Sequence, residues 1–73
     1  GSTSIVYAIP AAQPVSLRLY DLQGREVKTL VDEPQSAGRY RVDLSVRGLA
    51  SGTYFCRLQV GKIVQQRKMV LLK

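Results

Sequence analysis

The sequence predicts an all-β domain, an antiparallel Ig-like β-sandwich of six to seven short strands, and three observations support this fold class. Apolar and polar side chains alternate with a period of two along most segments. Gly, Pro and Asp interrupt the alternation roughly every eight to ten residues, as turns do between short strands. No window of about 12 residues shows a sustained helical period. The chain has 73 residues, enough for one domain. A small barrel is the structural alternative.

The first two expected strands, residues 4–9 and 15–20, are typical of half-buried strands. Each places three apolar side chains on one face: Ile5, Tyr7 and Ile9, then Val15, Leu17 and Leu19. Pro10 ends the first strand, because the N–H that proline lacks is not needed there. Tyr20 falls on the opposite face of the second strand. These two segments therefore predict strands with one buried face.

The segment Asp21-Leu22-Gln23-Gly24 predicts a tight turn. An Asp side chain can accept hydrogen bonds from its own backbone two residues on, and Gly can adopt the positive φ that closes the turn. The return strand, residues 25–31, alternates imperfectly, which predicts a β-bulge. Its expected inward residues are Val27 and either Leu30 or Val31.

The middle of the chain contains two irregular segments separated by a regular strand. We expect residues 32–38 to form a polar loop in which Gly38 makes a turn. Strand 39–44 alternates cleanly, with three inward residues, Tyr40, Val42 and Leu44. In residues 46–52 we expect a short helical turn whose Leu49 plugs one end of the sandwich.

The last two strands are expected at residues 53–60 and 63–72, joined by a tight hairpin at Gly61-Lys62. The first of them carries its inward row at Tyr54, Cys56, Leu58 and Val60. We interpret Gly1-Ser2 as a remnant of a cleaved expression tag. Residues 3–73 are then a single domain.

The inventory of side chains argues against catalysis. The chain has no His and one Cys, so it offers neither an imidazole base nor a cluster that could hold a metal. Its acids are expected in turns or on exposed strand positions: Asp21, Glu26, Asp32, Glu33 and Asp43. We therefore expect no enzymatic activity, no cofactor and no metal. No apolar run reaches the roughly 18 residues of a membrane span.

Three segments together resemble one family. They are the strand–turn–strand segment 17–27, the segment 48–58 with its Gly-x-Tyr-x-x-x-Leu pattern at Gly52 to Leu58, and the basic-then-aliphatic end 67–73. In this order they are similar to type A C-terminal sorting domains of the type IX (Por) secretion system. The Ig-like domain of the flagellar hook-capping protein has a related pattern. Family members begin with Asn-Pro, where this chain has Gly1-Ser2-Thr3.

The resemblance implies a non-catalytic C-terminal domain that directs type IX secretion and cell-surface attachment of a larger protein. Such domains commonly follow polysaccharide-degrading enzymes. It implies passage through the periplasm to the exterior of the outer membrane. Its partners would be the type IX machinery and cell-surface components, and we expect a monomer. The residues expected to be recognised are Lys68, Met69, Val70, Leu71, Leu72 and Lys73. The residues expected to support turns and strands are Tyr20, Asp21, Gly24, Gly38, Gly52 and Tyr54.

Several alternatives stay open. The run 69–72 is either a recognition tail or a core strand, and a strand can serve as both. The net charge of +6 is either a solvated surface or an attraction for anionic polysaccharide. Nucleic acid is disfavoured, because most of the aromatic residues fall on inward positions. Tyr20 and Phe55 do not, so a carbohydrate-binding module is the rival function, and an Ig-like spacer is a third. We expect Cys56 to be a small buried hydrophobe.

Overall fold

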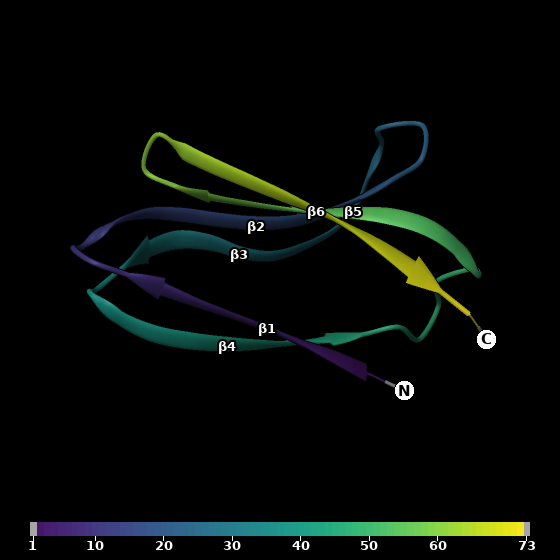
Figure 1. The fold of residues 1–73 in the computed structure, drawn as a ribbon, viewed down its shortest axis with the longest axis horizontal. Helices are drawn as coiled ribbons and strands as arrows, with labels where there is room; N and C mark the ends of the chain where they lie inside the picture. The colour runs from purple at the N-terminus through teal and green to yellow at the C-terminus, as the bar shows by residue number, and fades with distance from the viewer. Residues whose placement is uncertain (1, 73) are drawn as a thin grey trace.

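A computed structural model describes residues 2–72, and within them the chain forms six strands and no helix. The strands divide into a two-stranded sheet, β1-β4, and a four-stranded sheet in the order β3-β2-β5-β6 (Figure 1). All four strand pairs are antiparallel. The prediction of an all-β sandwich is confirmed. The bounds are β1 Ser2–Ile9, β2 Gln13–Asp21, β3 Glu26–Gln35, β4 Gly38–Ser45, β5 Gly52–Val60 and β6 Ile63–Leu71.

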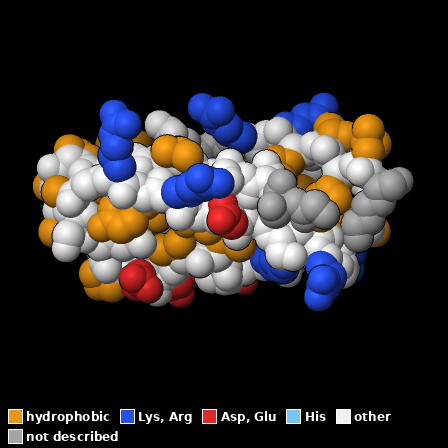
Figure 2. All heavy atoms as spheres, turned by 90° about the horizontal axis from the view of Figure 1, so that it is seen from below, with side chains coloured by type: hydrophobic (Ala, Val, Ile, Leu, Met, Phe, Trp, Pro, Cys, Tyr) orange, Lys and Arg blue, Asp and Glu red, His pale blue; other side chains and the backbone are white. Residues whose placement is uncertain are grey.

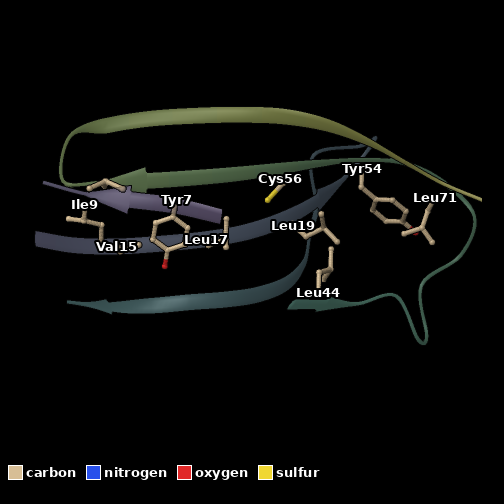
Figure 3. Close-up of a cluster of buried hydrophobic side chains, with 10 residues drawn as sticks. Tyr7, Ile9, Val15, Leu17, Leu19, Leu44, Tyr54, Cys56 and Leu71 are labelled. Carbon is tan, nitrogen blue, oxygen red and sulfur yellow. The ribbon is translucent and has the colours of Figure 1, made fainter. Parts of the chain in front are cut away.

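The core lies between the two sheets and is built from the alternating rows that the sequence shows. Three leucines are fully buried: Leu17 and Leu19 from β2, and Leu44 from β4. The other buried hydrophobic residues come from β1, β2, β5 and the end of β6: Tyr7, Ile9, Val15, Tyr54, Cys56, Val60 and Leu71 (Figure 3). β2 and β5 supply most of this core because they are the two central strands of the larger sheet.

β3 contains two bulges, and they explain why one inward prediction was wrong. The pairing of β2 with β3 shifts between Leu17 and Arg18 and again between Leu19 and Tyr20, so Leu30 and Val27 each lack a partner across the ladder. Such an extra residue breaks the alternation of the strand. Val27 is accordingly 37% exposed instead of buried, whereas Leu30 packs against the core, as does Val31.

The expected polar loop at residues 32–38 was also wrong. β3 continues to Gln35, and only Ser36 and Ala37 separate it from β4. Pro34 is tolerated in this strand because β3 is an edge strand and needs no hydrogen bond on its outer side. Gly38 starts β4 with a φ of +149°. The sheet therefore extends through a segment whose composition is typical of loops.

Residues 46–52 do not form the expected helical turn. They contain a β-turn, in which the Leu49 amide donates to the Val46 carbonyl at 3.1 Å. The expectation for Leu49 itself was correct to the extent that its side chain packs against the core. Within residues 2–72, no helix has the length and hydropathy needed to cross a bilayer.

Candidate functional site: the last strand and its groove

The turn between β2 and β3 is built as its sequence predicted. One carboxylate oxygen of Asp21 accepts hydrogen bonds from the backbone amides of Gln23 and Arg25, at 3.0 and 2.9 Å, and the other faces the Arg25 guanidinium at 3.0 Å. These bonds, led by the one from the Arg25 amide, lower the pKa of Asp21. Gly24 adopts a φ of +86°, which a residue with a Cβ rarely does. Asp21 and Gly24 therefore hold a turn.

Of the other residues expected to be structural, Tyr54 lines the interior and Gly52, like Gly38, starts a strand. Tyr54 is buried, and its hydroxyl donates to the Ala50 carbonyl at 2.7 Å, which ties the start of β5 to the preceding loop. Gly52 begins β5 with a φ of +151°. Tyr20 differs, because it lies half-buried on the outer face of the sheet.

The predicted recognition residues lie on β6 or just after it, at one edge of the four-stranded sheet. Some of these residues are buried and others are exposed. Leu71 is 6% exposed and belongs to the core, and Met69 packs partly against it. Val70 and Leu72 are 61% and 87% exposed, and Lys68 is also exposed. Lys73 lies outside the described residues. The last strand thus anchors itself through alternate residues and presents the others to solvent.

A groove of about 530 Å³ runs between β6 and the free edge of β1. β1 pairs only with β4, and β6 only with β5, so each strand has an unpaired backbone edge here. The floor is apolar and comes from the inner faces of β2 and β5: Leu17, Cys56, Leu58 and Val60. The β6 wall contributes both apolar and charged residues: Ile63, Gln65, Arg67, Lys68 and Met69. The two-stranded sheet leaves residues 63–68 of β6 uncovered, whereas Leu17, Cys56 and Val60 on the floor are buried.

Charge is divided unevenly along the chain. Residues 1–43 contain five cations and five acids, whereas residues 44–73 contain six cations and no acid, which together give the 11 cations and five acids of the whole chain. The entire net charge of +6 therefore comes from the second part. All four ion pairs found among the described residues lie between residues 18 and 43. On one face of the molecule, hydrophobic side chains reach the surface between cationic ones (Figure 2).

The aromatic residues do not form an open platform. Tyr20 and Phe55 are cross-strand partners on the outer face of the sheet, but the Arg57 guanidinium carbon sits 4.8 Å from the centre of the Tyr20 ring. This cation–π contact covers one face of the Tyr20 ring. Tyr7 and Tyr40 stack on each other with ring centres 5.5 Å apart, between β1 and β4.

Cys56 is buried on the inner face of β5 (Figure 3). Burial raises the pKa of its thiol, which lowers the fraction of reactive thiolate. The described residues contain no group of three or more His, Cys, Asp or Glu side chains placed to hold a metal ion. Cys56 thus serves as a small hydrophobe on the floor of the groove.

Comparison with protein families gives one match, the secretion system C-terminal sorting domain, over residues 2–72. The chain belongs to this family. Neither the curated proteins nor the solved structures gave a match. The resemblance to type IX sorting domains is confirmed over the described chain, and it carries with it interaction with the secretion machinery and export of the parent protein out of the cell.

The recognition hypothesis placed the functional residues of this sorting domain at 68–73 and did not include the groove. The groove contains residues that the hypothesis did not name, Gln65 and Arg67 on β6 and the free edge of β1. One signal for them was present in the sequence. Residues 63–70 read as pairs of like chemistry, two aliphatic residues, two glutamines, two cations and two apolar residues, so both faces of this strand carry the same pattern. A strand buried on one side alternates instead.

Proposed function

We propose that this chain is the sorting tail of a larger exported protein, and that residues 68–73 are the part that the type IX machinery recognises. The observation that carries the proposal is that the end of the last strand is partly buried and partly exposed. Leu71 fixes the strand in the core while Val70 and Leu72 remain exposed at the edge of the sheet. Exposed aliphatic residues on an edge strand favour aggregation through strand pairing. Their presence on β6 is therefore better explained by a partner that binds there.

The proposal extends to attachment of the exported protein at the cell surface. The acid-free, cationic second part of the chain supports this step, because cell-surface components are commonly anionic. A carbohydrate-binding role receives no comparable support, since Arg57 already occupies one ring face of Tyr20. The identity of the parent protein does not enter the proposal.

The test is an export assay in a bacterium that has the type IX system. A fluorescent reporter with a periplasmic signal peptide is fused to the chain, and the reporter is measured in periplasm, on the cell surface and in the medium. We expect the fusion to leave the periplasm. A reporter that stays in the periplasm would contradict the proposal and favour a spacer.

The recognition residues are tested by a double substitution, Val70→Ser with Leu72→Ser. Both side chains are exposed, so the fold should survive, whereas deleting residues 69–73 would also remove the buried Leu71. The matched control is Leu22→Ser with Val27→Ser, two exposed hydrophobic residues that do not line the groove. We expect loss of export for the first pair alone. Equal export from both, with far-UV circular dichroism showing both folded, would overturn the assignment of residues 68–73.

A further inference from the structure

We infer that the free edge of β6 and the groove beside it bind an extended peptide segment of a partner protein, in which two neighbouring carboxylates lie between aliphatic residues. This deepens the proposed sorting function by naming the chemistry of the partner. The binding itself can be measured on the isolated chain without export.

The first argument is the unfilled space between the sheets. The inner face of β6 has no strand of the smaller sheet above it, and Ile63 to Lys68 are all exposed although they pair residue for residue with β5. A strand added beside β6 would complete the ladder and would direct every second side chain into the groove of about 530 Å³. Those side chains would pack beside the β6 wall of the groove, which includes Ile63 and Met69.

The second argument is the pattern that β6 offers to such a strand. Along its inner face run Ile63, Gln65, Arg67 and Met69, and along its outer face run Val64, Gln66, Lys68 and Val70. Directly opposite residues of antiparallel strands share a face and interact most strongly. The complementary segment therefore carries aliphatic, carboxylate, polar and again aliphatic residues, in consecutive pairs.

The third argument is charge. Arg67 and Lys68 belong to none of the ion pairs among the described residues, and no acid occurs anywhere in residues 44–73. A second copy of this chain is a poor occupant, because pairing β6 with β6 about its centre would set the Arg67 side chains of the two copies against each other. An acidic segment removes that repulsion and supplies two cross-strand ion pairs.

The probe is a synthetic fluorescein-labelled peptide with the sequence Val-Leu-Glu-Glu-Thr-Thr-Val-Ile, written to run antiparallel to residues 63–70. Binding to the purified 73-residue chain is followed by fluorescence anisotropy at low salt. We expect saturable binding, and at least roughly tenfold weaker binding for Arg67→Glu with Lys68→Glu. Arg39→Glu with Arg47→Glu is the matched control, because it reverses two exposed cations outside β6 and changes the net charge by the same amount, and it should bind as the parent chain does. Equal loss in both variants would indicate only an effect of net charge and would overturn the inference.

Two further peptides separate strand addition from simple charge attraction. Alternate amides of an added strand point toward β6, so N-methylation of one alternate set should abolish binding, and methylation of the other set should not. If both methylated peptides bind equally, no strand is added and the inference fails. Alginate, a polyuronate, serves as competitor. Displacement of the peptide by alginate at equal carboxylate concentration would identify the surface as a site for anionic polysaccharide.

The outcome is independent of the export assay. Peptide binding without export of the reporter would leave the inference standing and overturn the sorting proposal. Export of the reporter by the parent chain, together with no binding of the peptide to that chain, would overturn the inference and leave the sorting proposal intact. Concentration-dependent dimerisation of the chain through β6, measured by light scattering, would also overturn the inference, since a second copy would then be the occupant.

Discussion

β5 and β6 are neighbours in one hairpin, paired in register over nine residues, yet their inner rows differ over residues 63–67 of β6. Cys56 is buried, whereas Arg67 directly opposite it is exposed, and the same contrast holds for Val60 and Ile63. The cause is position. β5 lies between β2 and β6 in the larger sheet, whereas β6 lies at its edge, and residues 63–68 of β6 are not covered by the smaller sheet. Pairing in a sheet therefore does not bury a strand, and only a layer above it does.

The largest expected contrast comes from truncating one residue on each strand. Tyr54→Ala removes a buried ring from β5 and should lower the free energy of unfolding by about 3–5 kcal/mol. Ile63→Ala removes a side chain that is 67% exposed and should change it by less than about 0.5 kcal/mol. Urea denaturation measures both. Similar losses for the two variants would show that the inner face of β6 is covered after all.

Acid should weaken the part of the chain that carries carboxylates. Hydrogen bonds hold the pKa values of three carboxyl groups below their usual range. The main donor is the Arg25 amide for Asp21, the Arg18 side chain for Glu26 and the Ser4 side chain for Asp43. A lowered pKa in the folded state contributes stability above the unfolded pKa, and this contribution is lost as pH falls through the folded value. The urea concentration at the midpoint of unfolding should therefore decrease when the pH is lowered below about 4.

Asp21→Asn supplies the check on that interpretation. It removes one of the three carboxyl groups whose pKa is lowered by folding, so its urea midpoint should depend less on pH than that of the parent chain. Because β5 and β6 contain no acid, the local effect should appear in hydrogen exchange of residues 21–43 and not in the hairpin. A midpoint that stays constant down to pH 3 would contradict the assignment.

The smallest change in stability is expected from giving β6 the inner row that β5 has. Gln65→Val with Arg67→Val should alter the free energy of unfolding by less than about 0.5 kcal/mol, because no layer covers these positions. The variant should instead self-associate, since it adds exposed apolar surface to a free edge and removes a cation from it. Light scattering across concentrations measures this. Gln66→Val, on the outer face, is a control for added β-propensity. Marked stabilisation without association would mean that the groove closes in solution.

Much of the fold followed from the sequence, and the errors have identifiable causes. Alternation placed the inward rows of β1, β2, β4 and β5 correctly, because each strand has one buried face. Val27 was misplaced because a bulge depends on the register between two strands. Residues 32–35 were misread because Pro34 rules out only a central strand, and the sequence does not show that β3 is an edge. The candidate site was predicted only in its last residues, 68–72.

The sequence by itself determined the strands, the turn held by Asp21 and Gly24, the lack of any His, and the family to which the chain belongs. Local interactions and periodicity are sufficient for these features. Only the tertiary structure decided which edges stay free, where the groove lies, and which of Val70, Leu71 and Leu72 face solvent. The physical reason is that strand order and coverage by a second sheet arise from contacts between residues far apart in the chain, and no local pattern encodes them.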